Sequence, residues 1–246
     1  PADSLSSTVI SNPLAWPTVT TNYQVIISDN NGCLDTAQVT VTVNTLPTID
    51  AGTDPTICFG DTTNLSAIGA IDYSWSPADS LSSSIISNPQ AWPSDTTQYI
   101  VTGTDINSCS NTDTVTVNVN PLPNVDAGNN TTICTGDSIQ LNATGATTYI
   151  WSPVTDLSDP TIADPFASPS TPTTYTVTGT DINGCVNVDS ITISLNSLPT
   201  ATVNNDTTIC IEDTAQLVAS GGTNYTWSPA DSLSSTVISN PLAWPT

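Results

Sequence analysis

The sequence lacks four residue types entirely: none of its 246 residues is lysine, arginine, histidine or methionine. With 22 acidic residues the formal net charge is −22, although only 9% of the residues are charged. Nucleic-acid binding needs cationic side chains that displace counterions from phosphate, so we exclude it. The same absence excludes electrostatic attachment to an anionic membrane surface. Because no ion pair between side chains can form, burial, backbone hydrogen bonds and cross-links must stabilise the fold.

The missing residue types also restrict the chemistry. Without histidine or lysine there is no nucleophile–histidine relay and no Schiff base. Glu212 is the single glutamate, and aspartates that recur with a repeat are typical of turns rather than of a catalytic carboxylate pair. We therefore expect no enzyme, no catalytic residue and no cofactor.

No apolar run approaches the ~18 residues of a transmembrane helix, so we expect no membrane insertion in this segment. The sequence shows neither an initiator methionine nor a signal peptide. We expect an interior segment of a longer or processed chain.

The sequence is periodic, with a 76-residue repeat that sets the step from Cys33 to Cys109 and from Cys109 to Cys185. Tryptophan, tyrosine and Leu-Pro positions keep the same spacing. Residues 1–18 are moreover identical to residues 229–246, a shift of three repeats, whereas the copy at 77–94 differs at four positions. This pattern predicts a 228-residue super-repeat within a long tandem array.

Leu-Pro pairs mark the predicted repeat boundaries, because proline ends a strand and stiffens a junction. We expect complete domains at 46–121 and 122–197. Residues 1–45 would be the C-terminal part of one repeat, and 198–246 the N-terminal part of another that continues into the next copy.

Each repeat is predicted to be a small all-β sandwich. Apolar residues alternate with polar ones, as in Val115, Val117 and Val119, and no stretch shows a helical stripe. Asn31-Gly32 and Asn183-Gly184 predict hairpin turns, and 77–93 predicts an irregular crossover between sheets. About seven short strands around a buried tryptophan indicate an immunoglobulin-like sandwich.

Two cysteines per repeat, without metal-ligand spacing, indicate disulfides formed in an oxidising compartment. A domain as small as one repeat buries little surface, so such a cross-link would help to stabilise it. We expect pairing within a repeat, Cys58 with Cys109 and Cys134 with Cys185, while Cys33 and Cys210 would pair with adjacent copies. The alternative, Cys33 with Cys58, would bridge two repeats.

The runs TICTGDSIQLNATGATTYIWSP, TTYTVTGTDINGC and NPLPNVDAG resemble the PKD-like, immunoglobulin-type repeats of giant Bacteroidota cell-surface proteins. That group includes adhesin-like and gliding-motility-associated proteins exported by type IX secretion. The strand YSWSP departs from the WDFGDG-like strand of polycystic-kidney-disease domains. The resemblance implies a secreted, extracellular, non-catalytic structural or adhesive array.

Several other positions are candidate sites. Asp29, Asp105 and Asp181 precede hairpin turns and would cap them, although their oxygens could also serve Ca²⁺. A second tryptophan set follows the crossover, and it would pack there or contact a glycan or another chain: Trp16, Trp92 and Trp244. Asp-Ser/Thr motifs like those of Bacteroidota O-glycosylation occur eleven times, at Ser4, Thr36, Thr62, Ser80, Thr96, Thr114, Ser138, Ser190, Thr207, Thr214 and Ser232.

We expect the chain to be a structural repeat segment of an extracellular filament, stalk or fibrous adhesin, which provides reach and stiffness and has further copies of the repeat as partners. The alternative is an adhesive array that binds carbohydrates or surfaces, with or without Ca²⁺. A remote alternative is a set of spacer domains in a secreted hydrolase.

Overall fold

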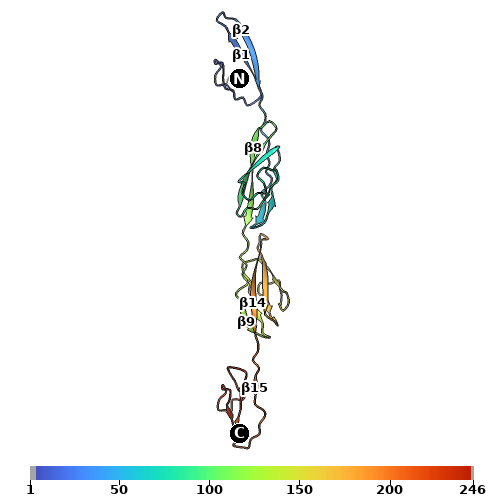
Figure 1. The fold of residues 1–246 in the computed structure, drawn as a ribbon, viewed down its shortest axis with the longest axis vertical. Coiled ribbons are helices and arrows are strands. Elements are labelled where there is room, and N and C mark those ends of the chain that lie inside the picture. The colour runs from blue at the N-terminus through green and yellow to red at the C-terminus, as the bar shows by residue number, and fades with distance from the viewer. Residues whose placement is uncertain (1–3, 245–246) are drawn as a thin grey trace. The chain divides into compact units, whose positions relative to one another are not determined.

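A computed structural model describes residues 4–244 of the chain (Figure 1). The chain divides into two compact units. The first extends to Leu122 and also includes Asn183–Cys185, and the second consists of Pro123–Ile182 and the residues from Val186 onward. Each unit contains one complete sandwich.

The first sandwich has a four-stranded sheet in the order β3-β8-β7-β5 and a two-stranded sheet of β4 and β6. Its strand β3 runs parallel to β8, whereas the other pairs are antiparallel. The strands are β3 (Thr56–Cys58), β4 (Thr63–Asn64), β5 (Asp72–Ser76), β6 (Gln90–Ala91), β7 (Thr97–Thr104) and β8 (Ser110–Asn120).

The second sandwich has the same topology, with the sheets β11-β13-β14-β9 and β10-β12. Its strand β9 is again parallel to β14. The strands are β9 (Thr131–Cys134), β10 (Ile139–Gln140), β11 (Thr148–Ser152), β12 (Phe166–Ala167), β13 (Thr173–Thr180) and β14 (Val186–Asn196).

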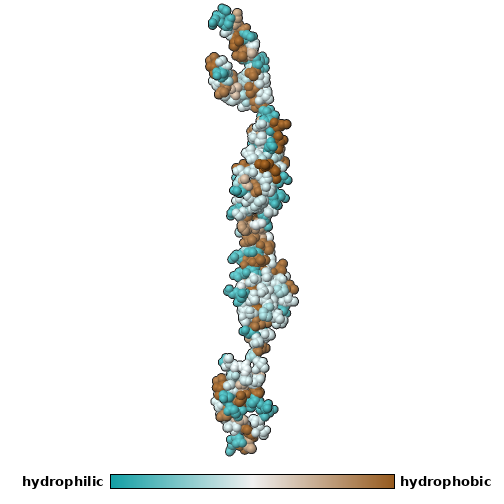
Figure 2. Space-filling view, viewed as in Figure 1, coloured by the Kyte–Doolittle hydropathy of each residue, from teal (hydrophilic) through white to brown (hydrophobic). Residues whose placement is uncertain are grey.

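The remaining strands form two-stranded sheets. They are β1 (Thr21–Ser28) with β2 (Leu34–Val41), β15 (Thr202–Val203) with β17 (Ala219–Ser220), and β16 (Ala215–Gln216) with β18 (Leu242–Ala243). Hydrophobic surface is visible on the β1–β2 hairpin in Figure 2, where Val25 is 52% exposed. Its repeat equivalent Val101 is 0% exposed, because the strands of the complete sandwich cover it.

The cores lie between the two sheets of each sandwich and use every second residue of a strand. In β7, Tyr99 and Val101 point inward and are buried, whereas Ile100 between them is exposed. Trp75 is buried in the first core, and its indole Nε1–H donates to the Ile86 carbonyl at 2.8 Å. Trp151 holds the same position in the second core and donates to Ile162 at 3.0 Å.

The predicted turns and crossover are confirmed. The hairpin turn between β1 and β2 contains Gly32 at a φ of +82°, a conformation that favours glycine. The segment after β5 leads from the four-stranded sheet to β6 in the two-stranded sheet, largely without regular structure. At Gly145 the surroundings also require glycine, because a Cβ there would collide with the Asn124 carbonyl.

Side chains of β8 and β14 hold the segment that follows each Leu-Pro pair. The Asp113 carboxylate accepts the Ala51 amide at 2.8 Å, and Asp189 accepts Ala127 at the same distance. The amide of Asn111 donates to the Pro47 carbonyl at 3.0 Å. These bonds fasten the N-terminal segment of each sandwich along the long strand of its four-stranded sheet.

The expected all-β sandwich class is confirmed: residues 4–244 contain no α-helix, and each complete sandwich combines a four-stranded with a two-stranded sheet. Accordingly, no described residue belongs to a helix long and apolar enough to cross a membrane. The exact repeat boundaries at 45/46, 121/122 and 197/198 stay predictions, and residues 1–3 and 245–246 of the two outer segments lie outside the described part.

Candidate cross-linking and contact sites

Cys58 and Cys185 form a disulfide. Their Cα atoms are 5.5 Å apart, within the usual range, and their sequence separation is 127. Cys58 is the last residue of β3, and Cys185 directly precedes β14. The Cys185 side chain is completely buried.

This bond corrects the pairing expected from the sequence, in which Cys58 bonded Cys109 and Cys134 bonded Cys185. In the parallel register, Cys58 lies opposite Asn120 at the end of β8, whereas Cys109 precedes the first residue of that strand. A strand of that length spans about 35 Å, far beyond the ~7 Å Cα limit of a disulfide. Cys134 and Cys185 are likewise separated by the length of β14.

The other four cysteines carry thiols that are unpaired within the described residues. Cys33, Cys134 and Cys210 are exposed, and Cys109 is half-buried. The sequence indicated that cysteines form disulfides but not that Cys58 bonds Cys185. Parallel pairing of β3 with the end of β8 leaves no signal in a single sequence. The sequence separation of 127 between Cys58 and Cys185 equals one repeat length plus the spacing of the two cysteines within a repeat. This relation becomes recognisable only once the register of β3 with β8 is known.

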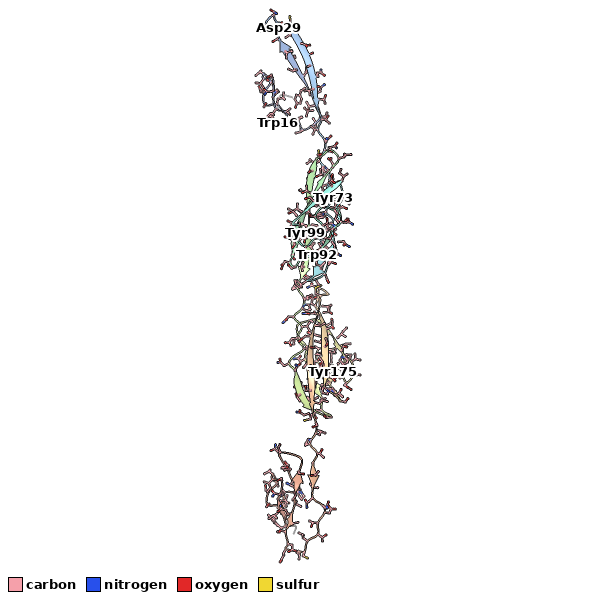
Figure 3. All side chains as sticks on the ribbon, in the orientation of Figure 1. Trp16, Asp29, Tyr73, Trp92, Tyr99 and Tyr175 are labelled. Carbon is pink, nitrogen blue, oxygen red and sulfur yellow. A yellow bond between two sulfur atoms is a disulfide. The ribbon has the colours of Figure 1, made fainter. Side chains whose placement is uncertain are left out.

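The aspartates before the hairpin turns act as turn caps. One carboxylate oxygen of Asp29 accepts the amides of Asn31 at 2.8 Å and Cys33 at 2.9 Å. The bond from Cys33 is the main reason that the pKa of Asp29 is lowered. Figure 3 shows Asp29 at the tip of the β1–β2 hairpin. Asp105 binds Asn107 and Cys109 in the same way.

No cluster of three or more metal-ligating side chains occurs among residues 4–244. Asp181 occupies the equivalent position in the β13–β14 turn. The carboxylates of Asp29 and Asp105 thus accept hydrogen bonds from backbone amides. Within residues 4–244 the turn aspartates are not part of a cluster of side chains that could bind Ca²⁺.

The tryptophans after the crossover are partly exposed, unlike those of the core. Trp16, Trp92 and Trp244 expose 56%, 43% and 41% of their surface. The backbone of each is hydrogen-bonded across the crossover, because its amide donates to the carbonyl twelve residues earlier, at Ser80 in the case of Trp92. Figure 3 labels Trp16 and Trp92 at such positions. Each ring thus offers a partly exposed aromatic surface on a hydrogen-bonded segment.

The eleven candidate O-glycosylation hydroxyls divide by exposure. Ser4, Ser80 and Ser232 are half-buried, and Ser80 and Ser232 lie in turns with positive φ. The Thr96 hydroxyl oxygen accepts the Val119 amide at 3.0 Å. Thr96 lies in an exposed position, as do the remaining sites, Thr36, Thr62, Thr114, Ser138, Ser190, Thr207 and Thr214.

The chain matches no protein-family model and no curated protein. Among solved structures it is similar to the N-terminal eight immunoglobulin domains of Down Syndrome Cell Adhesion Molecule (14% identity, 94% of this chain and 43% of that one, TM-score 0.36). It is also similar to extracellular cadherin domains of protocadherin gamma B7 (14%, 93% and 75%, 0.33). A third is a Ca²⁺-stabilised adhesin with which an Antarctic bacterium binds ice (11%, 83% and 65%, 0.34).

Proposed function

We propose that this chain is a structural segment of an extracellular filament, stalk or fibrous adhesin, and that it transmits mechanical load without catalysing a reaction. The observation that carries the proposal is the Cys58–Cys185 disulfide, which closes a loop across a sequence separation of 127. Strands β4 to β13 lie inside that loop. A tension applied to the chain on either side of the loop passes through the sulfur–sulfur bond.

The cross-link therefore protects the folded strands from extension. Without it, the segment from Cys58 to Cys185 would lengthen under tension to at most about 3.3–3.6 Å per residue, roughly 420–460 Å in all. With it, the same two residues stay within a few ångströms. A protein that keeps its length under load gains directly from this arrangement.

Three features support an extracellular setting. Disulfides form and persist in oxidising compartments. The net charge of −22, with no cationic residue, keeps copies soluble and mutually repelling at low salt. The resemblance to PKD-like Bacteroidota surface repeats favours the same location.

Single-molecule force spectroscopy on the 246-residue chain tests the proposal, with handles attached through terminal tags rather than cysteines. We expect the fully extended chain to be about 420–460 Å longer after reduction than before it. The Cys58→Ser variant should show the long form without reductant, and Cys109→Ser should behave as the parent. Equal extended lengths before and after reduction would refute the load-bearing role.

A second function is favoured by the exposed tryptophans, which suit stacking against sugar rings. We propose binding of a carbohydrate or surface through Trp16, Trp92 and Trp244 as the alternative role. Glycan-array binding that Trp92→Ala abolishes, with an unchanged circular dichroism spectrum, would support it. Absence of binding to any glycan or surface would exclude it.

A further inference from the structure

The six cysteines occupy only two kinds of position. One kind begins a turn. The residue three positions after the cysteine is always an aspartate, and its backbone amide donates a hydrogen bond to the cysteine carbonyl. These bonds measure 3.0 Å for Cys58, 3.0 Å for Cys134 and 3.1 Å for Cys210. We call these three residues the turn cysteines.

The second kind lies at the end of a hairpin turn, directly before a long strand. The amides of Cys33 and Cys109 each donate to an aspartate four residues earlier, both at 2.9 Å. Cys185 follows Asp181 at the same spacing. We call Cys33, Cys109 and Cys185 the hairpin cysteines.

The observed disulfide joins one residue of each kind, the turn cysteine Cys58 and the hairpin cysteine Cys185. The other two turn cysteines, Cys134 and Cys210, begin the same hydrogen-bonded turn as Cys58, and Cys134 is also the last residue of its strand, β9. Cys134 and Cys210 are exposed, as a residue that reaches another copy of the repeat must be.

We propose that every turn cysteine bonds a hairpin cysteine further along the repeat array, at the sequence separation of 127 that Cys58 and Cys185 show. Position 261 is one 228-residue super-repeat beyond Cys33, so Cys134 bonds Cys33 of another copy. Position 337 is likewise one super-repeat beyond Cys109, so Cys210 bonds Cys109 of another copy. The identity of 1–18 with 229–246 supplies this shift.

The bonds form by thiol–disulfide exchange. The turn and hairpin thiols each lose a proton, and together they lose two electrons to the disulfide of an oxidant, a protein or small-molecule disulfide. That oxidant leaves as two thiols, and one new sulfur–sulfur bond remains.

Overlapping cross-links of this kind would give the array two covalent routes. One route crosses from Cys58 to Cys185, follows the chain to Cys210 and crosses again. The other follows the chain from Cys109 to Cys134 and crosses there. The segments from Cys58 to Cys109 and from Cys134 to Cys185 join the two routes. This inference extends the proposed load-bearing function and rests on it.

Peptide mapping of the native, unreduced material tests the pairing. Free thiols are first blocked with iodoacetamide, and the protein is cut on the amino side of aspartate, since trypsin has no site. The six cysteines then fall on six different peptides, 29–34, 54–60, 105–112, 126–136, 181–188 and 206–212. We expect three linked pairs, 54–60 with 181–188, 126–136 with 29–34, and 206–212 with 105–112.

Any other pairing of these peptides would overturn the rule. Blocked thiols at Cys134 and Cys210 beside an intact Cys58–Cys185 bond would refute this inference alone. Loss of the Cys58–Cys185 pair would refute the proposed function as well. Two variants of the array test the pairing as well. Cys134→Ser should leave one reactive thiol per super-repeat, at Cys33. Cys58→Ser should also leave one reactive thiol per super-repeat, but at Cys185.

Discussion

Cys58 is the register partner of Asn120, the last residue of β8, although the two are far apart in the sequence. This parallel pairing places Cys58 at the end of the sheet where the chain leaves the first sandwich. Cys109, directly before β8, is thereby out of reach, and Cys58 instead bonds Cys185.

Removal of the disulfide should destabilise the chain. For Cys58→Ser, the loop-entropy model sets an upper value of about 5 kcal/mol for a loop of this length. We expect a lower urea midpoint than in the parent, measured by tryptophan fluorescence. Cys109→Ser is the matched control, because that thiol is unpaired in the described chain. Equal midpoints for both variants would contradict the prediction.

The core tryptophans should matter more for stability than those after the crossover. Trp151 is fully buried, so Trp151→Ala should lower the free energy of unfolding by about 3–5 kcal/mol through lost burial and a cavity. Trp92→Ala should cost clearly less, since 43% of that side chain is already exposed. Thermal melting of the two variants compares them directly, and an equal loss would count against the core assignment.

Acid should weaken the attachment of the segments after the Leu-Pro pairs. The amides of Ala51 and Ala127, followed by those of Thr114 and Ser190, lower the pKa of Asp113 and Asp189 below the ordinary 3.8. A lowered pKa in the folded state means that the stabilisation is complete above the unfolded value and is lost as pH falls through the folded one.

We therefore expect the urea concentration at the unfolding midpoint to decrease once the pH is lowered below about 4. The decrease should be smaller in the double variant Asp113→Asn, Asp189→Asn. Asp72→Asn, at an exposed position in β5, is the control and should retain the parent profile. A double variant with the unchanged acid profile would show that these carboxylates do not contribute.

Gly145 and Gly136 both have positive φ, but their surroundings differ. A Cβ at Gly145 would collide with the Asn124 backbone, whereas nothing lies within 4 Å of one at Gly136. Gly136→Ala should cost about 1 kcal/mol for the backbone conformation, and Gly145→Ala clearly more. Chemical denaturation of both variants measures the difference, and a cost for Gly145→Ala no larger than for Gly136→Ala would show that the backbone relaxes.

If the native protein carries O-glycans, the exposed hydroxyls should be occupied before the half-buried ones. We expect modification at Thr36, Ser138 and Thr214 rather than at Ser80 and Ser232, whose turns limit access. Mass spectrometry of the aspartate-cleaved peptides would locate the glycans. Preferential occupancy of Ser80 and Ser232 would contradict the accessibility argument.

Much of the fold could be predicted from local signals. The alternation at Val115, Val117 and Val119 predicted which residues of β8 face the core, because side chains of a strand alternate between its two faces. Asn31-Gly32 predicted a turn because glycine adopts positive φ without strain. The core position of Trp151 followed from its place beside Tyr149 in an alternating strand.

The β class and the core-facing residues were therefore determined by the sequence itself, since both depend on neighbours along the chain, and the repeat is read directly from the sequence. The partner of Cys58 was decided by tertiary structure. Whether β3 lies parallel to β8, and at which end, depends on pairing between distant parts of the chain, and a cysteine bonds whichever sulfur that pairing brings within reach.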